Sequence, residues 1–232
     1  SLYRRLMLGL GNSLSSTQYP GGWLPSDEGS LEAWYRFGEG ITLNGSDVSE
    51  WADSSSNSFD MVNTTATEQP AYSAGVLTFV SGDSNNLRLA SGHIVLDGAF
   101  VIGFRIDPSA HNTTFIASQA LSNELFKLID ADTIRVRNDG SSNINFDLDS
   151  GDVKDDAYWV LSRDGSDNLS VYKDGVLHGS SQSCAGTFDV DSIGARKTTP
   201  NYYAGTMKEI VFFKGTTSAA LIANIHDRLS GL

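Results

Sequence analysis

The sequence predicts an all-β fold built as a two-sheet antiparallel sandwich. Short runs that alternate apolar and polar residues recur roughly every ten residues, and Gly, Asn, Asp and Ser separate them. Of the 232 residues, only 19% are charged and 23 are glycine, a composition that disfavours coiled coils and long helical bundles. No repeat of fixed period is visible, which excludes propellers and solenoids.

Residues 1–28 differ from the rest of the chain and are interpreted as an N-terminal arm. The segment carries Arg4 and Arg5, a short apolar patch, and then turn-forming residues without a strand-length run. The apolar run is too short for the core of a signal peptide. Residues 29–232 are interpreted as one domain, and no segment approaches the roughly 18 apolar residues that span a bilayer.

About a dozen strands are expected in the domain. Residues 99–106 are apolar on both faces, which predicts a central strand, whereas residues 143–149 alternate cleanly. The dipeptides at 139–140, 164–165 and 174–175 are Asp-Gly, a strong signal for hairpin turns. The expected strands span residues 31–37, 75–80, 86–90, 99–106, 113–119, 124–130, 133–137, 143–149, 158–164, 168–175, 191–195 and 206–214.

One short C-terminal helix is predicted over residues 218–230. Leu221, Ile222, Ile225 and Leu229 share one face at helical spacing. Thr217 or Ser218 supplies the hydroxyl that caps its first turn.

Charge and cysteine content exclude several kinds of partner. The formal net charge is −12, which disfavours binding to nucleic-acid phosphates. Cys184 is the only cysteine, so an intrachain disulfide and a cysteine-based zinc cage are both excluded. This agrees with a chain made in a reducing cytoplasm.

The ordinary catalytic motifs are missing from the sequence. The four histidines are scattered, and no G-x-S-x-G elbow, H-E-x-x-H pair or phosphate-binding glycine loop occurs. Nucleophilic, metal-hydrolase and nucleotide chemistry are therefore not expected, and the chain is predicted not to be an enzyme.

The order of the runs resembles the concanavalin A-like lectin/glucanase superfamily, in particular its laminin-G-like jelly rolls. The resemblance extends from Leu31 to about Ile225 and implies a jelly-roll sandwich. Its most specific part is the block W-x-L-x-R-D-G followed by L-x-V-Y-x-D-G. The matching pieces are LEAWYRF, VSEWADSSSNSFDMVN, GVLTFVSGDSNNLRLA, AFVIGFRI, YWVLSRDGSDNLSVYKDGVL, DSIGA and YYAGTMKEIVFFKGTTSAALIANI.

The resemblance also bears on hydrolysis and on calcium. Glycosidases of the superfamily use paired carboxylates on one strand; here Asp147 and Asp149 share a face but no glutamate joins them, so they are interpreted as solvated residues. Laminin-G-like domains often bind Ca²⁺ through loop oxygens. Candidate ligands are Asp83, Asn85 and Asn86, with Asp139 or Asp167 to complete the set; the alternative is that Asp and Asn occur there because they satisfy turn geometry.

A loop near the C-terminus and the N-terminal arm are the remaining candidate binding segments. Asn201, Tyr202 and Tyr203 follow a proline, where an exposed ring could stack on a sugar or contact a protein partner; packing is the alternative. Trp34, Trp51 and Trp159 are expected in the core. The arm is expected to order against a partner subunit through charge and apolar surface, fraying being the alternative. Its candidate contacts are Tyr3, Arg4, Arg5, Leu6, Met7 and Leu8.

These observations lead to two functional hypotheses. The first is a non-enzymatic virion protein, a capsid decoration or fibre-like module whose arm binds capsid or other virion subunits, in a homotrimer and with a surface that can adhere to glycans. The second is a carbohydrate-binding lectin domain of a bacterial or extracellular protein. Neither requires a cofactor, although Ca²⁺ fits both, and neither involves nucleic acid or a membrane.

Overall fold

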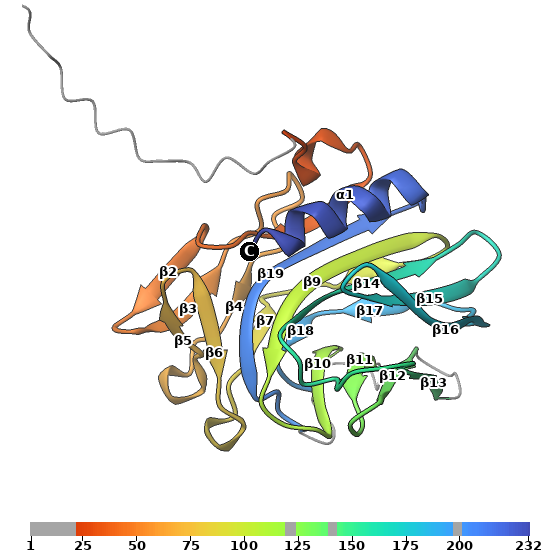
Figure 1. Ribbon diagram of the computed structural model, residues 1–232. Coiled ribbons are helices and arrows are strands. Elements are labelled where there is room, and N and C mark those ends of the chain that lie inside the picture. The colour runs from red at the N-terminus through yellow and green to blue at the C-terminus, as the bar shows by residue number, and fades with distance from the viewer. Residues whose placement is uncertain (1–21, 119–123, 139–142, 197–200) are drawn as a thin grey trace, which may run out of the picture.

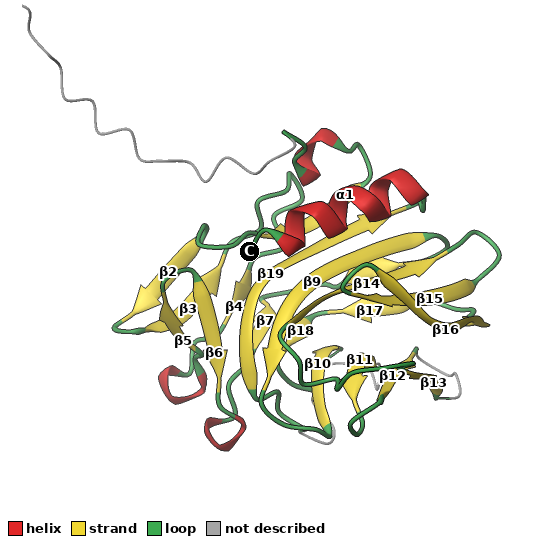
Figure 2. Ribbon diagram, viewed as in Figure 1, coloured by secondary structure: helices red, strands yellow, loops and turns green. Residues whose placement is uncertain are grey.

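The computed structural model describes residues 22–118, 124–138, 143–196 and 201–232 (Figure 1). It confirms the all-β sandwich with one C-terminal helix (Figure 2). The strands are β1 (Leu31–Tyr35), β2 (Ile41–Asn44), β3 (Asp47–Trp51), β4 (Met61–Val62), β5 (Ala71–Ser73), β6 (Val76–Phe79), β7 (Leu87–Leu89), β8 (Ile94–Leu96), β9 (Phe100–Pro108), β10 (Thr113–Ala117), β11 (Glu124–Leu128), β12 (Thr133–Arg137), β13 (Ile144–Asp147), β14 (Ala157–Arg163), β15 (Asn168–Lys173), β16 (Val176–Ser183), β17 (Phe188–Val190), β18 (Ser192–Ile193) and β19 (Gly205–Lys214). Three 3₁₀ turns, η1 (Pro25–Asp27), η2 (Ala66–Glu68) and η3 (Ser81–Asp83), and the helix α1 (Ala219–Ser230) complete the elements.

The strands form two layers. In the first layer the antiparallel order is β1-β19-β9-β14-β15-β16, and β6 continues the edge of β19 beside β1. In the second layer the order is β2-β3-β4-β7-β18-β10-β11-β12-β13. Strand β5 pairs with both β3 and β6 and so joins the layers, while β8 and β17 pair separately.

The strand predicted to be central is central. β9 pairs along its length with β14 on one side and β19 on the other, and residues on both of its faces are buried. One of these faces contacts the core between the layers, where Phe104 packs against Phe115 and Phe126. The other face lies beneath α1. The run of apolar residues at 99–106 is therefore explained by burial of both faces of β9.

The tryptophans fill the interior as the sequence predicts. Trp51 and Trp159 are completely buried in the core between the layers, and Trp34 is buried in a second apolar cluster between the first layer and α1. The sequence did not reveal that a second cluster exists on the outer face of the sheet.

Several strands were not predicted from the sequence. Strand β16, Val176–Ser183, contains mostly small polar residues and has little of the apolar alternation that marks a strand. It forms because its backbone completes the ladder beside β15. Strands β2 and β3 are also short, and a turn at Gly45 joins them. Backbone pairing, more than side-chain pattern, determines such strands.

The helix α1 begins and ends where the sequence predicts. Ser218 is the N-cap, and its hydroxyl oxygen accepts a hydrogen bond from the backbone N–H of Leu221 at 3.1 Å. Leu221, Ile225 and Leu229 are buried against the sheet, whereas Ile222 is only half-buried. The fourth buried residue of the helix is charged: Arg228.

Arg228 forms a buried ion pair with Glu209 of β19. Its Nη2 donates to Glu209 Oε2 at 2.8 Å, and its Nε donates to Oε1 of the same carboxylate. Trp34 Nε1 and the backbone N–H of Phe37 also donate to this carboxylate, at 3.0 and 3.1 Å. The guanidinium lies 4.8 Å from the centroid of the Trp34 ring. The pair therefore fixes the C-terminal half of α1 to the sheet through several hydrogen bonds.

Residues just before β1 also pack on this face. The Trp23 ring lies 6.2 Å from that of Phe213, and Trp23 Nε1 donates to Glu28 at 3.0 Å. Pro25 is buried in η1. The part of the arm nearest the domain, residues 23–28, thus contacts the apolar cluster under α1, while Tyr3 to Leu8 lie outside the described residues.

A glycine in β9 lets the helix approach the sheet, and its replacement is expected to destabilise the fold. A Cβ at Gly103 would lie 2.3 Å from Ile225 Cγ2 and 3.2 Å from Leu229 Cδ1. We expect Gly103→Ala to lower the free energy of unfolding by about 1–3 kcal/mol, because helix and sheet must separate. Urea denaturation measures this change.

Gly29→Ala is the matched control, because a Cβ there would meet nothing within 4 Å and the residue has no positive φ. Equal stability of the two variants would contradict the close contact between α1 and β9.

Candidate functional site

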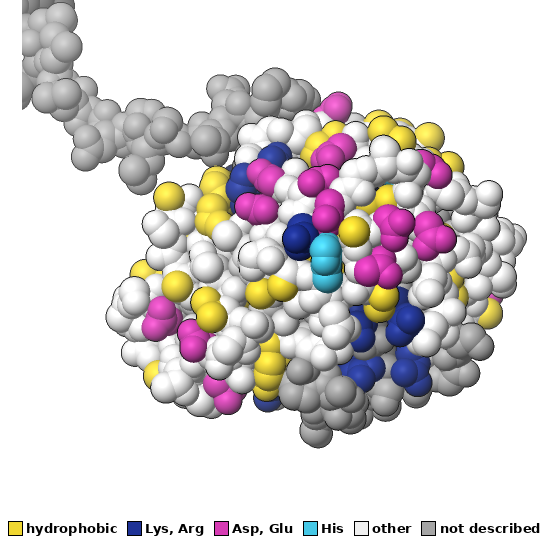
Figure 3. Space-filling view, turned by 60° about the horizontal axis from the view of Figure 1, so that its bottom comes forward, with side chains coloured by type: hydrophobic (Ala, Val, Ile, Leu, Met, Phe, Trp, Pro, Cys, Tyr) yellow, Lys and Arg dark blue, Asp and Glu magenta, His cyan; other side chains and the backbone are white. Residues whose placement is uncertain are grey.

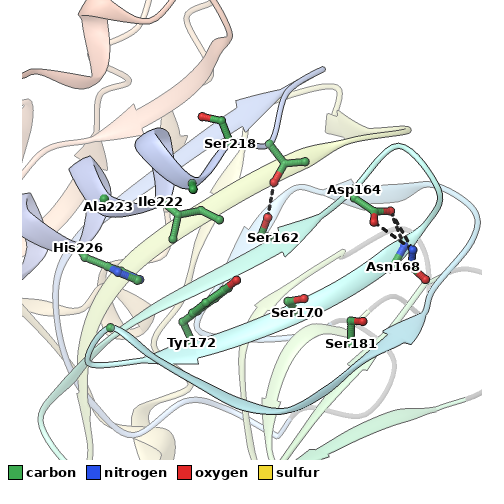
Figure 4. Close-up of a pocket in the computed structure, with 13 residues that line it drawn as sticks. Ser162, Asp164, Asn168, Ser170, Tyr172, Ser181, Ser218, Ile222, Ala223 and His226 are labelled. Atoms are coloured by element: carbon green, nitrogen blue, oxygen red, sulfur yellow. Dashed lines mark hydrogen bonds between the residues drawn. The ribbon is translucent and has the colours of Figure 1, made fainter.

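A groove lies between α1 and the outer face of β14–β16 (Figure 4). Its volume is about 490 Å³. One wall is the N-terminal half of α1 with the two residues before it, and the floor is the part of the sheet that the helix leaves uncovered. The groove exists because α1 covers β19, β9 and part of β14 but not the two strands beyond.

The floor carries an aromatic ring and a set of hydroxyl groups. Ser170 and Tyr172 alternate with the buried Leu169 and Val171 on β15, so both point outward. Ser162 of β14 lies directly opposite Ser170, and Ser181 projects from β16 (Figure 4). The floor therefore offers one half-buried ring beside several hydroxyl donors and acceptors.

The helix adds an apolar contact and an imidazole. Ile222 and His226 point from α1 toward the sheet (Figure 4). The His226 ring lies 5.7 Å from both the Tyr172 and the Tyr158 ring, in tilted arrangements. These three rings form an aromatic cluster, with Tyr172 and His226 lining the groove itself.

The far end of the groove is a fixed polar turn. Asp164 accepts hydrogen bonds from the backbone N–H groups of Ser166 and Asn168, at 2.8 and 2.9 Å. Asn168 Nδ2 also donates to both of its carboxylate oxygens. These hydrogen bonds, with that from the Asn168 side chain first, lower the pKa of Asp164. The Asp164 carboxylate is therefore held as an anion in one orientation.

A buried arginine supports this turn from below. Arg163 is fully buried, and its guanidinium donates to the carbonyl oxygens of Gly98, Cys184 and Gly186 at 2.7, 3.0 and 2.6 Å. The same group lies 4.8 Å from the centroid of the Phe100 ring. Arg163 thereby connects β14 to two other chain segments, and burial lowers its pKa.

His226 is held in its neutral form. Burial lowers its pKa below the ordinary value of 6.5, and the nearby Asp227 carboxylate only partly opposes this effect. A neutral imidazole can act as both a hydrogen-bond donor and an acceptor, which suits a hydroxyl-bearing ligand.

The loop expected to expose two tyrosines buries one of them. Tyr203 is completely buried, its ring packs against Phe79 and Phe115, and its hydroxyl donates to the Thr206 carbonyl at 2.9 Å. Of the two alternatives for Tyr203, ligand contact and packing, the structure therefore supports packing, because this large side chain closes the end of the core. Asn201 and Tyr202 are half-buried, and ligand contact by them stays a prediction.

Two of the three main calcium candidates, Asn85 and Asn86, make hydrogen bonds that hold their loop in place. Asn85 Oδ1 accepts from the Val80 N–H at 2.7 Å, and its Nδ2 donates to the Gln69 carbonyl at 3.1 Å. Asn86 is fully buried and donates to the Ser84 carbonyl, while Asp83 is exposed. These bonds show that the two asparagines stabilise the loop.

The described part of the chain holds no group of three or more His, Cys, Asp or Glu residues that could bind a metal ion. Of the two residues expected to complete the calcium set, Asp139 lies outside the described residues. Asp167 is at a different turn, 3.9 Å from Arg163 Nε. Calcium binding stays a prediction.

The other sequence candidates lie apart from the groove. Asp147 and Asp149 are both exposed. Asp147 accepts a hydrogen bond from Thr133, and Asp149 accepts one from the Gly179 N–H at 3.3 Å. No helix among the described residues has the length and apolar character to cross a membrane.

The groove is not predictable from the sequence alone. Residues 158–175 have the pattern of a hairpin and residues 218–230 that of a helix, but neither pattern indicates that the two lie side by side. The available signal was the outward-facing alternation of Asn168, Ser170 and Tyr172, which places a ring among polar residues on one face of a strand.

No family model matches the chain, and no curated protein matches it significantly. Solved structures share its fold at low identity. Domain 4 of an extracellular GH43 arabinanase from Geobacillus stearothermophilus, in complex with arabinotriose, is 15% identical with a TM-score of 0.51. That match covers 85% of this chain and 98% of the domain.

Two further structures extend the comparison. Trypanosoma rangeli sialidase is 14% identical with a TM-score of 0.60, and the match covers 88% of this chain but 34% of the sialidase. The binding domain of Paraclostridial Mosquitocidal Protein 1 is 10% identical with a TM-score of 0.54, covering 88% of this chain and 52% of that one. These likenesses show a β-sandwich fold and leave the ligand open.

The neutral state of His226 predicts how stability changes with pH. Its pKa is lower in the folded than in the unfolded protein, so the unfolded chain binds more protons as the pH falls from about 7.5 to about 5.5. The free energy of unfolding should therefore fall over this range. Urea denaturation at both pH values should show a smaller fall in His226→Gln than in the wild type.

An NMR titration of the His226 ring checks the cause directly. A midpoint above that of a free histidine would contradict this account.

Proposed function

We propose that this protein is a non-enzymatic carbohydrate-binding module and that the groove between α1 and β14–β16 is its binding site. The observation that carries the proposal is the composition of the groove. It presents the half-buried Tyr172 ring beside serine and threonine hydroxyls, an imidazole and a fixed carboxylate. Concave sites that combine an aromatic surface with a few placed polar groups are typical ligand sites.

The chemistry of a sugar matches this arrangement. One face of a pyranose or furanose ring carries C–H groups that pack on an aromatic ring, while its hydroxyls need hydrogen-bond partners around the edge. Tyr172 supplies the ring, and Ser170 and Ser181 offer hydroxyls beside it. Asp164 and the neutral His226 supply acceptors at opposite ends of the groove.

The same geometry argues for binding without hydrolysis. Glycosidases position two carboxyl groups across the scissile bond, one of them with a raised pKa. Among the described residues that line the groove, Asp164 is the one that carries a carboxylate, and hydrogen bonds lower its pKa. A lone, firmly ionised carboxylate can orient a sugar hydroxyl but lacks the second group.

The structural neighbours support a ligand of this class. The arabinanase domain, which shares the fold at a TM-score of 0.51, was determined with arabinotriose. The neighbour from the mosquitocidal protein is a binding domain. Both are independent examples of this sandwich in a binding role, and the ligand of the present groove is inferred from its own residues.

A glycan array with and without Ca²⁺, followed by calorimetric titration of the best oligosaccharide, tests the proposal. We expect Tyr172→Ala to weaken binding about tenfold, because the stacking surface is lost. Tyr172→Phe should retain most of the affinity. An array without hits in either condition would refute the proposal.

Tyr202→Ala is the matched control, since Tyr202 is also half-buried but lies in the loop singled out from sequence. Loss of affinity in Tyr202→Ala with full affinity in Tyr172→Ala would move the binding site to that loop.

The finer hypothesis, a virion protein anchored by its arm, stays a prediction. None of the three structures named above is a virion protein. The residues proposed to bind capsid subunits, from Tyr3 to Leu8, lie outside the described residues. A displayed module and a glycan-binding groove are compatible, so the binding proposal does not depend on this hypothesis.

A further inference from the structure

A second pocket lies at the end of the first layer where β6 and β9 finish and β19 begins, at the lower end of the molecule as drawn in Figure 1. It is lined by residues 78–81, 107–110 and 204–206, and we call it the lower pocket. Its volume is about 580 Å³, which is within the range of small-ligand sites. Figure 3 brings this end of the molecule forward and shows small hydrophobic areas among a mostly uncharged surface.

Three side chains form a row across the lower pocket. Thr206 of β19 pairs with Thr78 of β6 on one side and with Asp107 of β9 on the other. Neighbouring residues on each strand belong to the core, so the three side chains point to the outer face of the sheet. Opposite residues on antiparallel strands have Cβ atoms about 5 Å apart, so the row places a carboxylate and two hydroxyls within about 10 Å.

The Asp107 carboxylate is without a hydrogen-bond or ion-pair partner among the described residues, although two cations lie near it. Both cations are engaged elsewhere: Arg105 pairs with Asp156 through two hydrogen bonds of 3.1 Å, and Lys208 Nζ donates to the Leu232 backbone oxygen at 2.9 Å. Partial burial raises the pKa of the Asp107 carboxyl, and the neighbouring Asp156 adds to the rise. The fold therefore leaves Asp107 available as an acceptor.

The surroundings of this carboxylate are equally available and well fixed. The two threonine hydroxyls of the row form no hydrogen bond with described residues. At one end of the pocket the Ser109 N–H donates to the Ala204 carbonyl at 2.9 Å. Val80 is 47% exposed, and its N–H donates to Asn85 Oδ1 at 2.7 Å. The pocket thus combines unpaired polar groups with one apolar side chain on a fixed backbone.

A glycine brings the strands together at this end of the sheet. Gly205 has a φ of +140°, and a Cβ there would lie 2.4 Å from the Asp107 carbonyl oxygen and 2.6 Å from Pro108 Cα. A larger residue would push β19 away from β9 and displace the row. The bare backbone at Gly205 therefore keeps Asp107 beside Thr206.

We propose that the lower pocket binds a neutral saccharide through a pair of adjacent hydroxyl groups. A carboxylate accepts strong hydrogen bonds from two neighbouring hydroxyls, one on each of its oxygens. Threonine hydroxyls both donate and accept, so they can serve the remaining oxygens of the sugar, while Val80 offers a surface to its C–H groups. A negatively charged sugar is disfavoured, because its charge would face the Asp107 carboxylate.

An ammonium group is the competing ligand for an unpaired carboxylate. An ammonium group carries donors only and needs acceptors on every side. The row supplies one group that only accepts and two that also donate. This mixture fits a ligand rich in hydroxyl groups better than it fits a cation.

The lower pocket is separate from the groove. The two share no lining residue among those that the structure describes. Ser162 of the groove pairs with Val101 near the start of β9, and Asp107 lies six positions further along that strand, a separation of roughly 20 Å. Either site can therefore bind or fail without the other.

NMR titration of the full chain with the methyl glycosides of glucose, galactose, mannose and arabinose tests the proposal. We expect at least one glycoside to shift the backbone amides of Thr78, Val80 and Thr206. Asp107→Asn keeps the shape of the side chain and removes its charge, and it should weaken that binding about tenfold. Thr206→Val should weaken it about three- to tenfold, because one hydroxyl is lost. Tetrahydropyran-2-methanol, a similar ring without adjacent hydroxyls, should leave these amides unmoved.

Asp83→Asn is the matched control. Asp83 is exposed in η3, beside the pocket but outside its lining, so this variant removes the same charge and should bind like the wild type. Tyr172→Ala, in the groove, should also leave binding at the lower pocket unchanged. A circular-dichroism melt of each variant verifies folding.

Three results would overturn the proposal. The first is no shift at the lower pocket with any of the glycosides; shifts confined to the groove would do the same and leave the proposed function intact. The second is an equal loss of affinity in Asp107→Asn and Asp83→Asn, which would reduce the effect to net charge. The third is stronger binding of ethylammonium than of every glycoside, which would assign Asp107 to a cationic ligand.

Discussion

The buried ion pair between Glu209 and Arg228 is the interaction on which the outer face of the first layer depends. A charge taken out of water must be compensated, and here the carboxylate accepts bonds from Arg228, from the Trp34 indole and from the Phe37 backbone. Trp34 lies on β1, Phe37 follows that strand by two residues, and Arg228 lies on α1. The pair thus specifies where the helix lies as well as attaching it, and Gly103 beneath Ile225 allows the close approach. If the helix were displaced, the buried Glu209 carboxylate would lose its ion-pair partner.

The position of the helix in turn creates the groove. α1 covers the centre of the sheet and stops short of β15 and β16, which leaves Tyr172 half-buried beside His226. Arg163 acts from the other side of the sheet, where it donates hydrogen bonds to carbonyl groups of two segments, at Gly98 and at Cys184 and Gly186, and holds the turn that begins at Asp164. Two buried arginines thereby fix the two elements that bound the site. A rigid site loses little conformational entropy when it binds a ligand, and so favours affinity.

The local sequence pattern was enough to predict the fold class, the central strand and the helix with its Ser218 cap. The spacing of apolar residues along a short stretch of chain indicates which positions of a strand or helix are buried. Long-range contacts were not predictable in the same way. In the sequence, Arg163 is simply a residue of a predicted strand, with nothing to indicate that it is buried. Arg228 is a charged residue on an otherwise apolar helix face. The partners of both lie on other elements of the chain, and Arg228 and Glu209 are 19 positions apart. For Tyr203 the sequence left packing and ligand contact open, because turn-forming residues surround a ring that in the structure closes the core. Strand β16, poor in apolar residues, was missed because its partner strand determines its conformation.

We propose that the position of α1 on the sheet creates a sugar site on β14–β16. An NMR map of backbone amide shifts on addition of the best-binding oligosaccharide tests this most directly. The account predicts that the shifts concentrate at Ser170, Tyr172 and Ser181 on the sheet and at Ala219 to His226 on the helix. Shifts concentrated instead at Asn201 and Tyr202, with the groove amides unmoved, would contradict it.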